Sequence, residues 1–466
     1  MKNYLGQAVG LIGLVTAFLL ILSAVSKEST IAGWRIRKMD ILADLKNTPA
    51  SVALDSSETA ILDSLNYTTA TDTAKAAVGD IPIGEVDSAL FGQTIEDYSF
   101  GQDGLAQFFD AVDSIPISGE KVRVAFFGDS FIEGDIFLGD LRDTLQTLWG
   151  GAGVGFVPMT SEVARFRRTY IQRYEKWRTF SIIHNDGNDI PLGIDGHVYL
   201  PDSEAFTHFE GTSQYACRNT AAWSDVRLFY KATEGARFVW QLKGGTPIEA
   251  PLPATTGRLS IWEHREDQRK ITAFAARFPQ PNGLLLYGAS LESGPGIYMD
   301  NFSVRGNSGG KLCLIDHNMI QAFQQYQQYD LVILQFGLNA VTNSLRNIKW
   351  YRAELEKTFE HVRKAFPGVP VLVLSVPDRG GKVDGVLTTM ISVPYIVQMQ
   401  RDLARQHGFM FYDYYKGMGG YGSMVRLSEA HHPMLVNKDY THLTHEGGRL
   451  MGLKFGALLE KIRQEH

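Results

Sequence analysis

The stretch that decides the fold spans residues 122–134 and reads VRVAFFGDSFIEG. Its first half is nearly continuous in β-branched and aromatic side chains, which predicts a short strand in a sheet covered on both faces. The segment after it predicts a helix with one apolar stripe, because leucines recur at spacings of three and four: Leu138, Leu141, Leu145 and Leu148. Ser130 is therefore predicted to lie where a strand is followed by a helix.

A serine in this position has two interpretations. As a nucleophile, Ser130 would project its hydroxyl from the carboxyl edge of a parallel sheet, where such sheets bind ligands, and helix amide groups would face a developing oxyanion. As a structural element, Asp129 and Ser130 would cap the helix, since both residue types are favoured there. The tripeptide Gly128-Asp129-Ser130 alone does not distinguish the two.

Strands and helices alternate again in the last third of the chain. This alternation predicts an α/β fold with a parallel sheet and helices on both faces. The predicted strands are 300–305, 331–336, 369–376 and 409–412, and the predicted helices are 345–366, 387–408 and 446–463.

The region between 160 and 298 has a different pattern. Short alternating or aromatic-rich runs are separated by turn pairs such as Asp195-Gly196 and Glu234-Gly235. Short strands at this spacing predict an antiparallel β-sandwich or jelly roll. Because parallel-type elements resume after it, we expect this β region, residues 161–299, to be inserted into the α/β domain.

The amino-terminal part of the chain precedes both regions. Residues 5–25 carry no charged side chain and are long enough to cross a bilayer, which predicts a signal anchor, residues 1–26, with the body of the chain outside the cytoplasm. Ala24 and Ser26 form a weak cleavage pattern, so a cleaved secretion signal is the alternative. Residues 27–119 are rich in Ser, Thr, Asp and Ala and predict a stalk that is ordered only in part.

Length and composition limit the remaining possibilities. A chain of 466 residues with 44% hydrophobic and 21% charged residues predicts two folded units of ordinary globular composition. The net charge of −6 and the lack of a basic cluster argue against nucleic-acid binding. Two cysteines, Cys217 and Cys313, define no disulfide framework, and whether they pair is left open.

A second chemical motif occupies residues 439–442, Asp-Tyr-Thr-His, in a loop before the last helix. Three-residue spacing on a turn lets the Asp439 carboxylate bind one imidazole nitrogen of His442 while the other nitrogen faces a hydroxyl. With Gly128-Asp129-Ser130, Gly306 and Gly337-Leu338-Asn339, this motif matches the order of the four blocks of the SGNH, or GDSL-like, hydrolases. The sequence resembles that family over residues 120–160 and 300–466. The resemblance implies a flavodoxin-like three-layer fold.

The resemblance also implies a role for each matching residue. Ser130 would be the nucleophile, His442 the general base, and Asp439 the group that orients and stabilises the imidazole. The oxyanion would be bound by the backbone amides of Ser130 and Gly306 and by the side-chain amide of Asn339.

Some positions depart from the family pattern or leave alternatives. Ala340 stands where many family members have Asp, and its methyl side chain does not supply the supporting hydrogen bond of that residue. Ile132 replaces the second glycine of the G-x-S-x-G elbow, which argues against the α/β-hydrolase fold. Gly309 and Gly310 are alternatives to Gly306 as the second amide donor.

Within the family, the sequence looks most like the peptidoglycan O-acetylesterases. The β region between the first two blocks and residues 153–158, GVGFVP, carry this likeness. It implies an exported bacterial enzyme whose insert resembles a carbohydrate-binding module. Four tryptophans of the insert would either stack on sugar rings or belong to its core: Trp177, Trp223, Trp240 and Trp262.

The function expected from the sequence is therefore a serine esterase that deacetylates a cell-envelope carbohydrate at the periplasmic face of the inner membrane. The alternatives are an O-acetyltransferase that uses the same triad and a non-catalytic glycan-binding protein. We expect no cofactor and no metal, because the histidine cluster in the carboxyl-terminal region lacks a metal-ligand pattern: His431, His432, His442 and His445.

Overall fold

The computed structural model describes residues 29–31, 34–36, 93–101, 103–184, 190–212 and 218–466. The chain divides into two compact units, 1–55 and 56–466. In the first unit, β1 (Ser29–Ile31) pairs antiparallel with β2 (Trp34–Ile36). The predicted anchor segment, 5–25, lies outside the described residues. Within the described ranges, no helix is both long and apolar enough to cross a bilayer.

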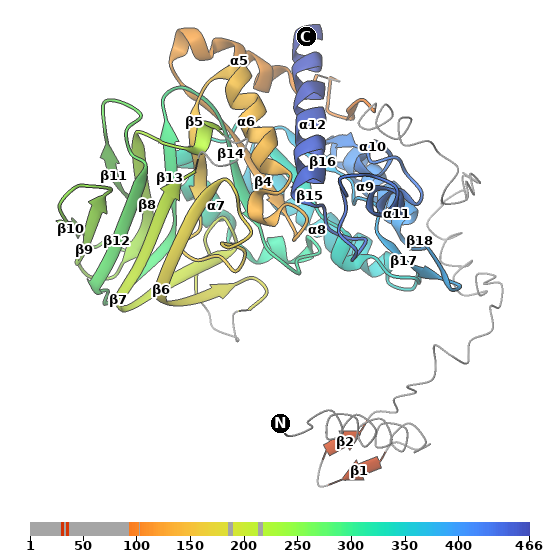
Figure 1. Ribbon diagram of the computed structural model, residues 1–466, viewed down its shortest axis with the longest axis horizontal. Coiled ribbons are helices and arrows are strands. Elements are labelled where there is room, and N and C mark those ends of the chain that lie inside the picture. Colours follow the sequence, from red (N-terminus) through yellow and green to blue (C-terminus); the bar gives the residue numbers. More distant parts are fainter. Residues whose placement is uncertain (1–28, 32–33, 37–92, 102, 185–189, 213–217) are drawn as a thin grey trace, which may run out of the picture. The chain divides into compact units, whose positions relative to one another are not determined.

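A mixed sheet forms the centre of the second unit (Figure 1). In the described part of the chain its strand order is β14-β4-β15-β16-β19-β3. Five strands are parallel and β3 is antiparallel at one edge: β4 (Lys121–Gly128), β14 (Gly296–Ser303), β15 (Leu331–Gln335), β16 (Val371–Leu374), β19 (Met410–Tyr412) and β3 (Glu96–Asp97). In chain order the parallel strands lie as 2-1-3-4-5, the flavodoxin-like doubly wound order. The predicted α/β fold with a parallel sheet is confirmed.

Helices cover both faces of this sheet (Figure 1). Adjacent side chains of β4 point to opposite faces: Phe126 packs against Phe137 at the start of α6, and Phe127 packs against Phe366 at the end of α8. This explains the continuous apolar run of β4. The first face carries α5 (Ala106–Ser118), α6 (Leu138–Trp149) and α12 (His445–Glu465), and the other carries α7 (His317–Gln327), α8 (Ile348–Ala365) and α9 (Val393–His407). Short helices follow β19: α10 (Tyr414–Gly417) and α11 (Ser423–Glu429).

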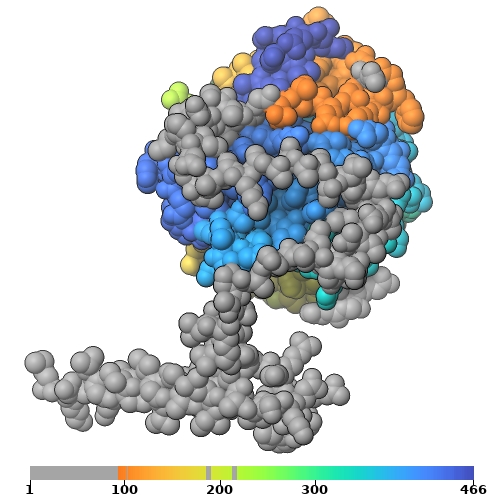
Figure 2. Space-filling view, turned by 90° about the vertical axis from the view of Figure 1, so that its right-hand side faces the viewer, coloured from red at the N-terminus to blue at the C-terminus, as the bar shows by residue number. Residues whose placement is uncertain are grey.

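The α/β region begins earlier than the sequence predicts. The sequence predicts a stalk that extends to residue 119, but β3 pairs with β19 and α5 packs against β4. The carboxyl end of α12 lies beside α5, where Arg463 pairs with Asp113 (Figure 2). Apolar side chains at helical spacing explain the docking of α5: Phe108, Phe109, Val112 and Ile115 are all buried.

The predicted helix 387–408 is wrong over its first residues. Residues 380–389 form a hairpin of β17 (Gly380–Val383) and β18 (Val386–Thr389), and α9 starts only at Val393. Asp384 and Gly385 connect the two strands with φ values of 51° and 80°. Two positive φ values are the requirement of a type I′ turn, for which Asp-Gly is a preferred pair.

A second, antiparallel sheet is built from the residues between β4 and β14 (Figure 1). Nine of the described strands take part, and they enclose an apolar core: β5 (Ala152–Val157), β6 (Tyr170–Ser181), β7 (His197–Gly211), β8 (Asp225–Ala232), β9 (Ala236–Leu242), β10 (Ile248–Leu252), β11 (Ser260–Arg265), β12 (Ala273–Gln280) and β13 (Leu284–Ser293). It begins before residue 161, because β5 pairs with β13, and it ends before 299, because β14 starts at Gly296. Both sheets belong to the compact unit 56–466.

Buried charges join the two sheets at the amino end of β4. Glu292 of β13 is fully buried and accepts hydrogen bonds from Lys121 (2.7 Å), Arg123 (2.6 Å) and Arg227 of β8 (2.8 Å). Burial opposes ionisation of Glu292, yet the three cations hold its pKa well below the usual value. The carboxylate is therefore ionised, and it ties strands of both sheets together.

Candidate active site

Ser130 lies at the carboxyl end of β4, as predicted. β4 ends at Gly128, a turn and the short helix η1 (Glu133–Asp135) follow, and α6 begins only at Leu138. The residue that caps α6 is Phe137, which makes no side-chain cap hydrogen bond. The interpretation of Ser130 as a cap of this helix is therefore wrong. Ser130 stands beside the point where the strand order reverses between β4 and β15, the position at which doubly wound sheets bind ligands.

The structure brings Ser130, His442 and Asp439 into one hydrogen-bonded row. The Ser130 Oγ lies 2.9 Å from His442 Nε2, and His442 Nδ1 lies 2.7 Å from Asp439 Oδ2. Because a carboxylate only accepts, Nδ1 carries the proton and Nε2 accepts from the serine hydroxyl. This is the geometry of a nucleophile, a base and an orienting carboxylate.

Asp439 is held by the backbone of its own loop. Its Oδ1 accepts from the amides of Thr441 and His442, both at 3.0 Å. Partial burial alone would raise the pKa of Asp439, but the hydrogen bonds from the His442 ring and from the two amides lower it below its usual value. The carboxylate stays ionised and keeps the imidazole in the tautomer that accepts from Ser130.

The helix α12 fixes the position of this loop. Thr444 caps α12 by accepting from the Gly447 amide at 3.1 Å. Gly448 lets α12 approach the residues between β4 and α6, since a Cβ there would lie 1.9 Å from the Ile136 carbonyl oxygen. The close packing of α12 therefore aligns His442 with Ser130.

The two other predicted oxyanion donors lie together. Asn339 lies in η4 (Leu338–Ala340), directly after β15, and its Nδ2 donates to the Asn307 carbonyl oxygen at 3.0 Å. Gly306, which precedes Asn307, follows β14 with φ of 80°, a conformation that favours glycine. The Asn339 amide is thus oriented through one hydrogen, and its second hydrogen remains for a ligand.

The alternatives to Gly306 fit less well. The Gly309 amide already donates to Asn307 Oδ1 at 2.9 Å. Gly310 is buried, and a Cβ there would touch the Glu354 side chain of α8. Gly306 is exposed, and a Cβ at this residue would meet no described atom closer than 4.0 Å. We therefore retain Gly306 as the second donor, and the catalytic role of all these residues stays a prediction.

Two residues next to this site have surroundings that the sequence does not predict. Asp129 is fully buried directly before Ser130, and burial raises the pKa of its carboxyl to about 7. Its Oδ1 accepts from the Phe131 amide at 2.9 Å. Arg379 donates to the Leu338 carbonyl oxygen at 2.8 Å, and the amide of the next residue, Gly380, donates to Tyr440. No local pattern marks Arg379, because its partners lie far away in the sequence.

The remaining polar residues that the sequence singled out have other surroundings. His431 contacts the Pro433 carbonyl oxygen, and the His445 ring bonds to the Phe166 carbonyl. In the described parts of the chain, no group of His, Cys, Asp and Glu side chains is arranged to hold a metal ion. Cys313 has a free thiol, whereas Cys217 lies outside the described residues.

Comparisons with known proteins identify the fold. No family model and no curated protein matches the sequence. The structure is similar to that of a peptidoglycan O-acetylesterase, with a TM-score of 0.63 and 21% identity over 80% of this chain and 99% of that chain. Weaker matches are an acetyl xylan esterase (TM-score 0.27, 17% identity, 35% of this chain and 80% of that chain) and a family two carbohydrate esterase from Clostridium thermocellum (0.25, 11%, 59% and 98%). The first match covers most of both chains and shows a common fold.

Proposed function

We propose that this protein is an exported serine esterase that removes O-acetyl groups from a cell-envelope carbohydrate, with peptidoglycan as the substrate. The observation that carries the proposal is the hydrogen-bonded row of Ser130, His442 and Asp439 at the carboxyl edge of the sheet. The fold shared with a peptidoglycan O-acetylesterase supports the choice of substrate. Export and anchoring rest on the sequence of residues 5–25.

The reaction has two halves that use the same residues. Ser130 Oγ attacks the acetyl carbonyl carbon while His442 Nε2 takes the hydroxyl proton. The oxyanion that forms is bound by the amides of Ser130 and Gly306 and by the free hydrogen of the Asn339 side chain. The carbon–oxygen bond to the sugar then breaks, and His442 returns the proton to the departing sugar hydroxyl.

Water completes the second half. His442 removes a proton from the water that attacks the acetyl-enzyme, and acetate leaves as Ser130 regains its proton. Asp439 stabilises the imidazolium in both halves without taking the proton. An O-acetyltransferase would differ only in the acceptor, a sugar hydroxyl in place of water.

The test is hydrolysis of p-nitrophenyl acetate by the full chain and by Ser130→Ala. We expect the variant to lose roughly 10⁴-fold or more in kcat with an unchanged unfolding temperature. Ser114→Ala, at an exposed serine of α5, is the matched control and keeps full activity. Equal activity in Ser130→Ala and the parent would refute the mechanism. Release of acetate from O-acetylated peptidoglycan, with and without an added sugar acceptor, separates hydrolysis from transfer.

A further inference from the structure

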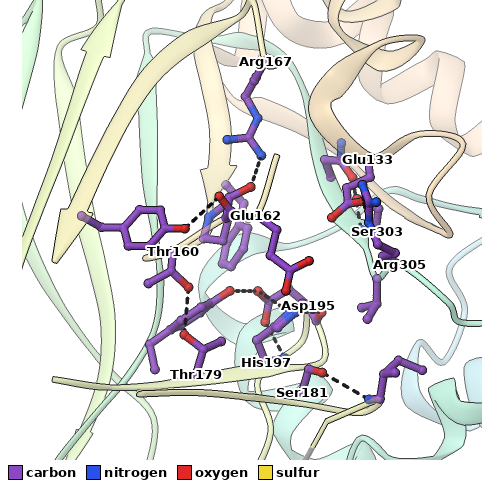
Figure 3. Close-up of a pocket in the computed structure, with 18 of the residues that line it drawn as sticks. Glu133, Thr160, Glu162, Arg167, Thr179, Ser181, Asp195, His197, Ser303 and Arg305 are labelled. Atoms are coloured by element: carbon purple, nitrogen blue, oxygen red, sulfur yellow. Dashed lines mark hydrogen bonds and ion pairs between the residues drawn. The ribbon is translucent and has the colours of Figure 1, made fainter. Parts of the chain in front are cut away.

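A cavity of about 450 Å³ lies between the antiparallel sheet and the carboxyl end of β14 (Figure 3). Its size falls in the range of small-molecule sites, about 300–1,000 Å³. One wall comes from β6 and the start of β7, and the other comes from η1 and the residues after β14. Ser130 and His442 are not among the residues that line it.

Three segments of the cavity wall lead directly to the residues of the candidate active site. Glu133 follows Ser130 closely in the chain, and Arg305, with which it forms an ion pair at 2.8 Å, immediately precedes Gly306. The loop 160–167 forms a third part of the wall, and its residue Phe166 accepts a hydrogen bond from His445. A molecule held at Ser130 therefore has this cavity beside it.

A bulge in β6 aims its side chains into the cavity. The pairing of β6 with β7 shifts register between Glu175 and Trp177, and Lys176 has φ of 61°. Side chains of a regular strand alternate between faces, so Tyr174 and Trp177 would point to opposite sides without the extra residue. With it, residues before and after the bulge line the same wall: Tyr170, Tyr174, Trp177, Thr179 and Ser181.

Aromatic rings on this wall have fixed orientations. The Trp177 Nε1 donates to the Phe206 carbonyl oxygen at 2.9 Å, and the Tyr174 hydroxyl donates to the Ser161 carbonyl oxygen at 3.1 Å. Trp177 and Trp262 are half-buried and pack against the core of the antiparallel sheet, whereas Trp223 and Trp240 are buried within that core. Of the four tryptophans that the sequence singled out, Trp177 is thus the one that lines the cavity.

Polar groups on both walls of the cavity are held by partners within it. Asp195 accepts from the Tyr199 hydroxyl at 2.8 Å and lies 3.3 Å from the His197 ring (Figure 3). On the opposite wall, Glu133 forms an ion pair with Arg305. A polar cavity with hydrogen-bonding side chains beside oriented aromatic rings suits a polyhydroxylated ligand.

We propose that this cavity is a subsite for a second sugar unit of the glycan, next to the unit whose acetyl ester lies at Ser130. The proposal rests on the proposed function, since it assigns the substrate class of the same site. It makes the enzyme selective for oligomeric over monomeric acetylated sugars. Tyr174 and Trp177 contact the sugar ring, and His197 and Thr179 bind its hydroxyl or amide groups.

The test compares the full chain on O-acetylated N-acetylglucosamine and O-acetylated chitotriose, and on the corresponding xylose monomer and trimer. We expect kcat/KM for at least one trimer to exceed that for its monomer by about tenfold. Tyr174→Ala, which removes a rim aromatic, and Thr179→Phe, which fills the cavity, should each abolish this advantage. The advantage is measured as the ratio of kcat/KM for trimer and monomer within each protein, so a change in folded fraction cancels. Glu175→Ala, on the opposite face of β6, is the matched control and keeps the trimer preference.

Binding to the inactive Ser130→Ala variant gives a readout that does not depend on catalysis. Calorimetry should show tighter binding of the trimer than of the monomer, and Thr179→Phe in the same background should remove the difference. If the parent hydrolyses no ester while this binding pattern holds, the proposed esterase fails and the subsite stands. If trimers and monomers are hydrolysed and bound equally well in both sugar series, the subsite is refuted.

Discussion

The two ends of β4 carry opposite kinds of polar cluster. At the amino end, Glu292 is fully buried among three cations that come from both sheets. At the carboxyl end, the side chains of His442 and Asp439 are 37% and 49% exposed and form a single row with Ser130. One strand thus joins a buried ion cluster to a row of groups that water and substrate can reach.

The difference separates residues that stabilise the fold from residues proposed to act in catalysis. A buried ion pair is poor evidence of net stabilisation, but removal of one partner is strongly destabilising because the others are left buried and unpaired. A partly exposed catalytic row contributes little to folding, since solvent screens its charges. We therefore expect substitutions at the amino end to change stability and substitutions at the carboxyl end to change turnover.

The largest effect on turnover, after loss of the nucleophile, is expected from Asp439→Asn. The asparagine oxygen can still accept from the Thr441 and His442 amides, but its NH₂ group would face His442 Nδ1 and force the tautomer that cannot accept from Ser130. We expect kcat to fall by about 10³- to 10⁴-fold with an unchanged unfolding temperature. A large loss of stability would show that the carboxyl end of β4 also supports the fold, contrary to this separation of roles.

The converse experiment is Glu292→Gln. It keeps the shape of the side chain but leaves Arg123 and Arg227 without the carboxylate that they share, while Lys121 keeps its second partner Asp225 at 3.0 Å. The free energy of unfolding should therefore fall by about 3–5 kcal/mol. Denaturant unfolding measures this, and the specific activity of the folded fraction should be unchanged. Arg178→Gln, which breaks the exposed pair with Asp202 in the antiparallel sheet, is the control and should change stability by less than about 1 kcal/mol. Equal effects of the two variants would contradict a cohesive role for Glu292.

Asn339→Ala tests the oxyanion donor. Removal of one such donor typically costs about 2.7–4 kcal/mol of transition-state stabilisation, so kcat on p-nitrophenyl acetate should drop by about 10²- to 10³-fold. Asn343→Ala is the matched control, because this exposed amide also donates to a backbone carbonyl, that of Lys382, away from Ser130. Near-normal turnover of Asn339→Ala would remove Asn339 from the site.

The local patterns of the sequence were sufficient for the parallel sheet, and they marked three residues of the candidate site whose roles came only from the resemblance. The apolar run ending in Gly128-Asp129-Ser130 identified β4, and the Asp439–His442 motif identified the loop before α12, because both signals lie within a few residues. The contact of Ser130 Oγ with His442 Nε2 at 2.9 Å could not be calculated from the sequence. It was expected only from the resemblance to the SGNH hydrolases.

The features that the sequence did not reveal depend on contacts between distant segments. The boundary of the antiparallel sheet was misplaced because β5 is assigned by its pairing with β13, more than a hundred residues later. The cavity wall combines residues of β6, η1 and the end of β14, so no single stretch of sequence predicts it. The Asp384-Gly385 turn is different, because it is a local signal. Asp-Gly is a preferred pair for a hairpin turn, but the prediction of a helix over 387–408 left no room for the second strand of this hairpin.

Asp129 is the exception to the division between the two ends of β4, and it allows the finest test. It is a fully buried carboxyl at the carboxyl end of β4, and burial raises its pKa to about 7. At the amino end, by contrast, the cations around Glu292 lower the pKa of that residue. The folded protein therefore holds a proton on Asp129 that the unfolded chain loses above about pH 4. Stability should consequently fall as pH rises from about 4 to 7.

In Asp129→Asn the acceptor for the Phe131 amide remains and this group no longer titrates. The decrease in unfolding temperature between pH 4.5 and 7 should thus be smaller in the variant than in the parent, because the contribution of Asp129 is missing. If the unfolding temperatures of the two proteins change equally with pH, Asp129 is already ionised in the folded state. The carboxyl end of β4 would then also hold a buried charge.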